Sequence, residues 1–487
     1  MINEVVKVHD KFSVEIKMGY EPRKDRKDNE FSIKTWLFIP DSLDINSSTY
    51  KKDDFYNDFK SNIRLITPPY LLREIAEGER SVFGYLEEAF HKVANHPTPK
   101  NEANYEYHIR MFHSILRSAL RKEIQHILRN ELEEDRNYLI KSYLGNVKKI
   151  ACRYRELRRI VNVPSIRKEM FDYFLFGDEF MSNQFEQHSY FLHRGLRKIH
   201  PSDFQMHKEA ILNLIREEIA YKKSKGYLVV EENPADHNRW LIHRRGVLKK
   251  YFEGQLLLSS RKKKEGVFMV QLLYSLAAGL AMIFGAALTF VFQQSLGKFT
   301  IPLFVALVII YMLKDRIKDL SRHYLVGKIN KRFFDHKTII RVKGDEKIGW
   351  CKESFDFVRE DSVPSRVMKH RNRSRIVEVE SRGAGEKIIF YRKLLQLDQK
   401  ALHNTYGNYN ITGVADIIRF NVSRLIQKMD NPEIPLFFLK EDDFKKISGE
   451  KVYFINMVMR FKLDDQTSYR RYRIIFNRRG IKKVEKV

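Results

Sequence analysis

Cysteine is almost absent from the sequence. Its two cysteines, Cys152 and Cys351, lie far apart, so they do not form the dense disulfide framework of small secreted domains. Residues 1–12 also lack the apolar stretch of a secretory signal peptide. Both absences favour a protein whose soluble parts stay in a reducing compartment, and we expect no export of the N-terminal part.

The sequence motifs of common catalytic sites are missing as well. There is no GxxxxGK[ST] phosphate loop, no HExxH zinc motif and no GxSxG nucleophile motif. Residues 383–385, Gly-Ala-Gly, lie between two predicted strands and are interpreted as a turn. The triplets 15–17 and 398–400 have the acidic-x-Lys form that some metal-dependent nucleases use, but solvated strand faces often produce it. We therefore predict no metal ligands and no cofactor, and the sequence leans away from an enzyme.

Acidic residues are outnumbered by basic ones. The chain has 89 Lys and Arg against 62 Asp and Glu, a net charge of +27, and the excess is concentrated after residue 313. Such a surplus suits contacts with anionic lipid headgroups, acidic proteins or nucleic acid.

Two uncharged runs interrupt this basic sequence. The first, residues 267–292, contains no Asp, Glu, Lys, Arg or His, and the second, residues 299–313, is equally uncharged but shorter. A bilayer core needs roughly 20 apolar helical residues. The first run meets that length. The second is marginal and is either a second span, helped by snorkelling of Lys314 and Arg316, or a re-entrant or interfacial segment.

The charges around the two runs predict their orientation. Residues 261–264, before the first run, and 314–318, after the second, are basic, whereas the connecting loop carries only Lys298. Because Lys and Arg accumulate on the cytoplasmic side, both large soluble regions are expected in the cytoplasm with both termini. We expect a two-pass protein of a bacterial inner membrane.

Small residues recur every four positions in the first run, at Ala277, Ala281, Gly285 and Thr289. A stripe of this kind lets another helix approach closely inside a membrane. The partner is either the second run of the same hairpin or another copy of the chain.

Periodicity predicts an integral membrane protein of five regions. A two-helix transmembrane hairpin joins a mainly helical N-terminal cytosolic domain, which begins with a β-hairpin, to a basic α+β C-terminal domain. The predicted β-hairpin pairs residues 12–20 with 31–40. The predicted regions are the helical domain 1–236, a basic amphipathic segment 237–266, the hairpin 267–313, a juxtamembrane helix 314–334 and the α+β domain 335–487.

Within the C-terminal domain we expect several hairpins and one helix. Residues 336–358 and 374–397 are each predicted to form a β-hairpin, and 453–463 is predicted to pair with 468–479. An amphipathic helix is predicted over residues 411–429.

Basic side chains interleaved with aromatic residues are the candidate contacts for lipid, acidic protein or nucleic acid. They are Arg244, Arg245, Lys249, Lys250, Arg371, Arg373, Arg470, Arg471, Arg473, Arg478 and Arg479. Residues 237–266 could lie on an anionic membrane surface or pack as an ordinary helix.

Three functions fit these features. A membrane-anchored cytosolic scaffold or regulatory subunit, with a protein partner or further copies of itself, agrees best with the absence of catalytic motifs. A membrane-tethered nucleic-acid-binding protein or nuclease is the alternative, and an oligomeric pore-forming or membrane-perturbing effector is the third.

Overall fold

The fold was obtained as a computed structural model. It describes residues 2–487 except 24, 78–81, 165, 233–234, 297–300, 331–332, 343–345, 373–384, 406–408, 441–442 and 465. The chain divides into two compact units. The sheet unit comprises Met1–Ile63, Leu258–Leu402 and Val414–Val487, and the helical unit comprises Arg64–Leu257 and His403–Gly413. The fold is thus a mixture of helices and sheet, as predicted in outline.

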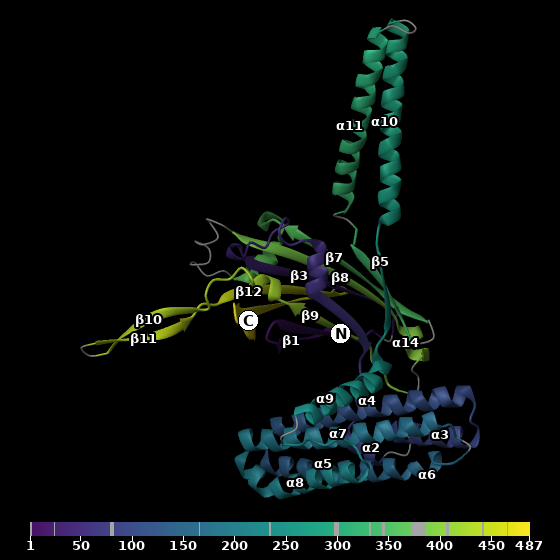
Figure 1. Ribbon diagram of the computed structural model, residues 1–487, viewed down its shortest axis with the longest axis vertical. Helices are drawn as coiled ribbons and strands as arrows, with labels where there is room; N and C mark the ends of the chain where they lie inside the picture. The colour runs from purple at the N-terminus through teal and green to yellow at the C-terminus, as the bar shows by residue number, and fades with distance from the viewer. Residues whose placement is uncertain are drawn as a thin grey trace. The chain divides into compact units, whose positions relative to one another are not determined.

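The sheet unit contains two antiparallel sheets and an isolated ribbon (Figure 1). The four-stranded sheet has the order β1 (Ile2–Asp10), β2 (Ser13–Tyr20), β9 (Val414–Asn421), β4 (Phe59–Leu65). The eight-stranded sheet has the order β14 (Gly480–Lys486), β13 (Gln466–Asn477), β12 (Tyr453–Leu463), β3 (Asp28–Pro40), β8 (Glu386–Asp398), β7 (Lys347–Val358), β6 (His336–Arg341), β5 (Ser259–Lys264). The ribbon pairs β10 (Glu433–Lys440) with β11 (Asp443–Glu450).

Alternating apolar side chains explain how the two sheets pack. On β2, Val14, Ile16, Met18 and Tyr20 are all buried, at every second position. Phe59 on β4 contacts Tyr391 on β8, with ring centroids 4.8 Å apart, so side chains of the two sheets meet in one core. Short helical segments complete the unit: η1 (Asp41–Leu43), α1 (Lys52–Asp58), η3 (Glu360–Ser362), α12 (Ser365–Arg371), α14 (Gln399–Thr405), which extends into the helical unit, and α15 (Ser423–Ile426).

The predicted N-terminal β-hairpin is wrong in its pairing. Both segments are strands, but β2 pairs with β1 and β9, whereas β3 pairs with β8 and β12. Both strands therefore obtain partners from the C-terminal half of the chain. Residues 1–63 consequently belong to the sheet unit, whereas the sequence predicted that they belong to the N-terminal helical domain.

The predicted helix over residues 411–429 is also wrong. Its residues Val414–Asn421 form β9, which lies between β2 and β4, and the short α15 follows. The apolar residues of the segment Val-Ala-Asp-Ile-Ile-Arg-Phe fit both the helical period of 3.6 residues and the strand period of two. The neighbouring strands β2 and β4 decide for the strand, because Val414, Ile418 and Phe420 are buried on one of its faces.

Two other predicted pairings are confirmed. β6 pairs with β7 between residues 336 and 353, and β12 pairs with β13 from Tyr453–Phe476 to Leu463–Gln466. Of the hairpin predicted over 374–397, β8 is present, while residues 374–384, including most of the predicted turn, lie outside the described part of the chain.

The helical unit is built from amphipathic helices. They are α2 (Leu72–Glu77), α3 (Val82–Asn95), α4 (Pro99–Arg129), α5 (Glu133–Glu156), α6 (Arg158–Val161), α7 (Lys168–Ile199), α8 (Pro201–Ser224) and α9 (Ala235–Glu253), followed by η2 (Gly254–Leu256). α4 packs against α3, α7 and α9, and α5 packs against α8. Thr98 caps α4 by accepting a hydrogen bond from the Asn101 backbone N–H at 3.3 Å. The predicted amphipathic segment 237–266 is therefore split into a helix and the strand β5.

A long helical hairpin is inserted between β5 and β6. It consists of α10 (Val267–Leu296) and α11 (Ile301–Asn330), which lie side by side in Figure 1. α11 includes most of the predicted juxtamembrane helix, so the second uncharged run and the charged residues after it form one continuous helix.

Candidate functional site

α10 has the properties of a membrane-spanning helix. Its segment Val267–Gln294 is 28 residues long with mean hydropathy 2.1. Large apolar side chains on its outer surface are exposed, among them Phe268 at 78% and Ile283 at 68%. Within the described residues it is the one helix long and apolar enough to cross a bilayer. This supports membrane association.

α11 is less uniform, because its uncharged part ends at Lys314. Lys314 lies opposite Gly285 of α10, where an added Cβ would approach its side chain to 3.3 Å. Further along, the Arg322 guanidinium lies 5.3 Å from the centre of the Tyr274 ring. The charged half of α11 therefore runs beside an uncharged half of α10.

The small-residue stripe faces α11. Ala277 and Ala281 are 0% and 1% exposed, and Gly285 is buried. The Thr289 hydroxyl donates a hydrogen bond to the Gly285 carbonyl at 2.8 Å. This placement agrees with the interpretation that the stripe serves the hairpin itself.

Paired strands hold the base of the hairpin. Lys264 at the end of β5 is in register with His336 at the start of β6. One residue further, the Glu265 N–H donates to the Asp335 carbonyl at 3.1 Å. The two ends of the hairpin are therefore fixed next to each other.

A cluster of buried charges joins the two sheets close to this base. Lys393 of β8 forms ion pairs with Asp416 of β9 and with Glu353 of β7, the latter at 3.1 Å. The Lys393 and Asp416 side chains are 1% exposed and that of Glu353 is 9% exposed. The Ser61 hydroxyl donates to Asp416 at 2.7 Å and accepts from Lys393 at 3.0 Å. The Tyr391 hydroxyl donates to Glu353 at 2.5 Å.

The ionisation of the cluster follows from these contacts. Burial alone would lower the pKa of Lys393, but the charge of Asp416, followed by other groups including Glu353, raises it well above its ordinary value. Burial opposes ionisation of Glu353 too, yet Lys393 and the Tyr391 hydrogen bond lower its pKa. Burial raises the pKa of Asp416, and Lys393 opposes that rise. Lys393 is thus held as a cation between two acidic side chains.

A cavity of about 310 Å³ adjoins the cluster. Its lining comes from β4 and β5, the edge strands of the two sheets, and from α1, β6 and β7. Its lining includes Tyr56, Ser61, Ser260, Lys262, Thr338 and Glu353. Tyr56 is oriented by its hydroxyl, which donates to Asp335 at 3.0 Å.

Sequence reasoning missed this cluster, although a signal was present. Lys393 follows Tyr391 and precedes Leu395 on the buried face of β8, and Asp416 lies between Val414 and Ile418 on the buried face of β9. A charged residue in phase with apolar neighbours on a strand indicates a buried charge, which needs a partner.

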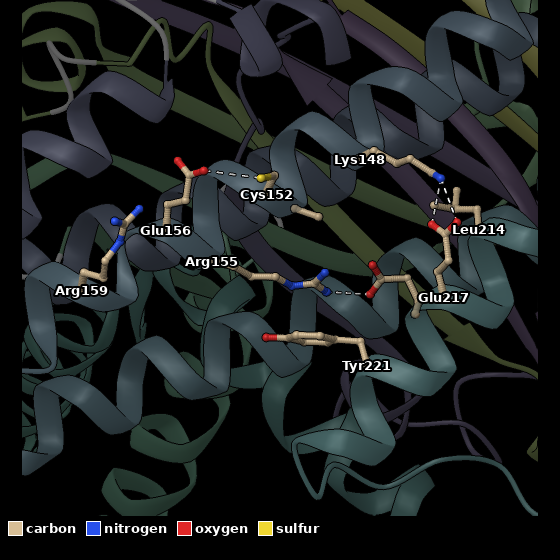
Figure 2. A pocket seen from close by; sticks show the side chains of 10 residues that line it. Lys148, Cys152, Arg155, Glu156, Arg159, Leu214, Glu217 and Tyr221 are labelled. Carbon is tan, nitrogen blue, oxygen red and sulfur yellow. Dashed lines mark hydrogen bonds and ion pairs between the residues drawn. The ribbon is translucent and has the colours of Figure 1, made fainter.

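A second cavity, of about 630 Å³, lies between α5 and α8 of the helical unit (Figure 2). Arg155 donates to Glu218 at 2.8 Å and stacks over the Tyr221 ring at 3.5 Å. At the rim, Lys148 pairs with Glu217 at 2.8 Å. Because these charges pair with each other, the cavity does not select a ligand of one sign.

Two of the four predicted basic residues on α9 pair with acidic residues of the helical unit. Arg244 pairs with Glu179 at 2.7 Å and Arg245 with Glu186 at 3.1 Å, while Lys249 and Lys250 are exposed. α9 buries Leu241, Leu248 and Phe252.

The predicted basic residues of the C-terminal region are dispersed over the sheet unit. Arg371 is buried against Glu386 at 2.6 Å, and Arg373 lies outside the described residues. The remaining residues are placed as follows: Arg470 pairs with Glu4 at 3.1 Å, Arg471 donates to Asn456 at 3.2 Å, Arg473 lies 4.0 Å from Glu485, Arg479 pairs with Glu433 at 2.5 Å, and Arg478 is exposed. Pairing with carboxylates reduces the charge that these arginines can offer to phosphates.

No group of three or more His, Cys, Asp or Glu side chains suited to a metal ion occurs among the described residues. No protein-family model, no curated protein and no solved structure matches the chain.

Proposed function

We propose that the protein is a membrane-anchored scaffold or regulatory subunit, held in the bilayer by the two-span hairpin α10–α11. The observation that carries the proposal is the pairing of β5 with β6 at the hairpin base, with Lys264 opposite His336. Strands that pair with each other lie on one side of a membrane. If α10 crosses the bilayer, the chain must therefore cross back before β6.

α11 is the segment available for the return. Its uncharged part, residues 301–313, covers only about 20 Å at 1.5 Å per residue, against a hydrocarbon thickness of about 30 Å. Lys314, Arg316 and Lys318 follow. Because Lys314 lies opposite Gly285, a full crossing by α10 places these charges within the bilayer, where ion pairs such as Lys318–Asp315 reduce their cost. In this arrangement the tip of the hairpin lies close to the far surface of the membrane.

In this proposal the soluble parts lie on one side of the membrane. The N-terminal strand β1 and the C-terminal strand β14 both belong to the sheet unit. Both termini then lie on the side of the hairpin base, which the basic flanks assign to the cytoplasm, in a bacterial inner membrane. Two cytosolic units on one anchor, without a recognised catalytic motif, suit the assembly of a membrane-associated complex.

Anionic lipid headgroups are the proposed contacts at the membrane surface. The strand β5 contributes Arg261, Lys263 and Lys264 directly before α10. A basic residue near an anionic leaflet contributes about 1 kcal/mol to its attraction.

Excision of the hairpin tests the anchor. Replacing residues 267–333 by a Gly/Ser loop of about four residues joins β5 to β6 as an ordinary β-hairpin. We expect this variant to leave the membrane fraction and to keep the circular dichroism of the two soluble units. A folded variant that still sediments with membranes would contradict the hairpin as the anchor.

Mild-detergent purification of the intact protein tests the scaffold role. We expect a defined protein partner to co-purify, and repeated recovery of the protein alone would contradict that role.

A pore-forming function is the second candidate, favoured by the unequal halves of the hairpin. Beside the uncharged α10, α11 carries Lys314, Asp315, Lys318, Asp319 and Arg322, with ion pairs three residues apart. In an oligomer, α10 could face lipid while this part of α11 faces a water-filled interior. A monomeric detergent-solubilised protein would exclude such a pore.

A further inference from the structure

The ammonium group of Lys262 occupies a defined position in the cavity of the sheet unit. Its Nζ atom lies 4.2 Å from the centre of the Tyr56 ring and 3.8 Å from Glu353 Oε2. An aromatic face attracts cations, and a carboxylate adds charge complementarity. The cavity therefore contains a site for an ammonium group, which a lysine of the chain itself fills.

The charges below this site favour a cation. Lys393 carries one positive charge between Glu353 and Asp416, so with both acids ionised these three side chains sum to one negative charge. A buried net charge is costly unless a neighbouring charge compensates it. Lys262 supplies that charge from an edge strand, and its side chain is 43% exposed, compared with 1% for Lys393.

The cavity has more room than a lysine ammonium uses. Its volume is about 310 Å³, and the residues that line it include Ser61, Ser260 and Thr338 as well as a second lysine, Lys60. Such a volume lies at the lower end of the range for small-molecule sites. We propose that the cavity binds a small organic cation with a primary ammonium group, which displaces Lys262 from Tyr56 and Glu353.

Displacement would act on the base of the hairpin. Lys262 precedes Lys264, which pairs with His336, on the same strand. The hydroxyl of Tyr56 donates to Asp335, the neighbour of His336, and Asp335 also pairs with Lys52 at 2.6 Å. A ligand at this site therefore contacts groups that hold both ends of α10–α11. This consequence rests on the proposed anchor, whereas binding itself does not.

Calorimetric titration of the full-length protein in mild detergent tests the site. The probe is n-butylammonium, with n-butanol and butyrate as neutral and anionic analogues of similar shape. Lys262→Met removes the tethered competitor and should raise the affinity for butylammonium at least about tenfold, without creating affinity for the analogues. Lys263→Met, at the next position of β5 and outside the cavity lining, is the matched control and should leave the affinity unchanged.

A second substitution separates the site from general charge effects. Added to Lys262→Met, Tyr56→Leu removes the aromatic face but keeps Lys393 and its carboxylates, and it should weaken butylammonium binding by about tenfold. Lack of binding by Lys262→Met up to about 10 mM probe, equal binding of butanol, or retention of affinity after Tyr56→Leu would overturn the proposal. Because titration in detergent is independent of membrane topology, failure of the anchor would leave this result interpretable.

Discussion

At the scale of single residues, the sheet unit depends on a lysine enclosed between two acids. Lys393→Met leaves Glu353 and Asp416 buried without a cation between them, and we expect a loss of about 3–5 kcal/mol in the free energy of unfolding. Urea unfolding of the detergent-solubilised protein measures it. The control is Lys387→Met on the same strand. Its half-exposed pair with Asp41, at 3.1 Å, should contribute less than about 1 kcal/mol.

A triple variant distinguishes lost charge compensation from lost packing. If unpaired carboxylates cause the destabilisation, adding Glu353→Met and Asp416→Leu to Lys393→Met should recover at least half of the loss. Equal stability of Lys393→Met and Lys387→Met would contradict the account of the cluster.

Buried histidines give the helical unit its expected sensitivity to acid. Burial lowers the pKa of His113 to about 3 and those of His108 and His188 to about 4. The unfolded chain has histidine pKa values near 6.5, so below that pH it binds protons that the folded state does not. Stability is therefore lost as pH falls from about 6.5 towards 4, by about 2 kcal/mol per histidine at pH 5.

Hydrogen exchange within α4 at about pH 7 and pH 5, corrected for the intrinsic exchange rate, measures this loss. His113→Phe should reduce the pH dependence by about a third, because it removes one of the three buried histidines. A phenyl ring suits this position, since His113 lies among the aromatic rings of Tyr154, Phe180 and Phe252. Equal opening free energies of α4 at both pH values would contradict the predicted burial.

At the scale of elements, the small-residue stripe sets how closely α10 and α11 approach. Ala281 is buried against α11, with 1% of its surface exposed. Ala281→Phe should therefore force the two helices apart and reduce the free energy of their association by about 1–3 kcal/mol. Oxidative cross-linking between Gly285→Cys and Lys314→Cys, in a Cys152→Ser background, reports the separation. We expect the intramolecular cross-link to form and Ala281→Phe to suppress it.

The matched control is Ile283→Phe, since Ile283 is 68% exposed on the outer surface of α10. It should leave the cross-link intact. Cross-links that form between chains instead of within one chain would show that the stripe serves oligomerisation.

The elements also show how far sequence patterns determine this fold. β12 and β13 could be predicted because they alternate clearly and adjoin a short turn. β2 and β3 alternate as clearly, but β9, β8 and β12, which pair with them in addition to β1, come from the other half of the chain, and periodicity carries no information on partners. Local pattern therefore predicted strands, while long-range pairing decided the sheets.

The candidate sites divide in the same way. The uncharged run of α10 is local and was visible in the sequence. The charged cluster requires that β7, β8 and β9 meet, and only Lys393 and Asp416 in apolar phase indicated that a buried charge existed. The arginines of the C-terminal region are clustered in the sequence but do not form one site in the structure. Arg470 and Arg473, for example, lie near different carboxylates, those of Glu4 and Glu485.

At the scale of the whole molecule, the proposed anchor requires that the soluble units lie on one side of the membrane, with α10 and α11 inside the bilayer. The sheet unit combines residues from both termini and from both sides of the hairpin. A single crossing by α10 would place β5 and β6 on opposite sides and break their pairing. The membrane topology of the chain therefore tests whether the observed sheet is compatible with the proposed anchor.

The most direct test is labelling of single cysteines with a membrane-impermeant maleimide, in a Cys152→Ser background, in intact cells and in inverted membrane vesicles. The sites are Lys298→Cys in the connecting loop, Lys263→Cys before the hairpin and Lys347→Cys after it. We predict labelling of Lys298→Cys in intact cells only, and of the other two in inverted vesicles only. Labelling of Lys263→Cys and Lys347→Cys from opposite sides would contradict the two-span anchor, and labelling of Lys298→Cys from the cytoplasmic side would show that the hairpin does not span the membrane.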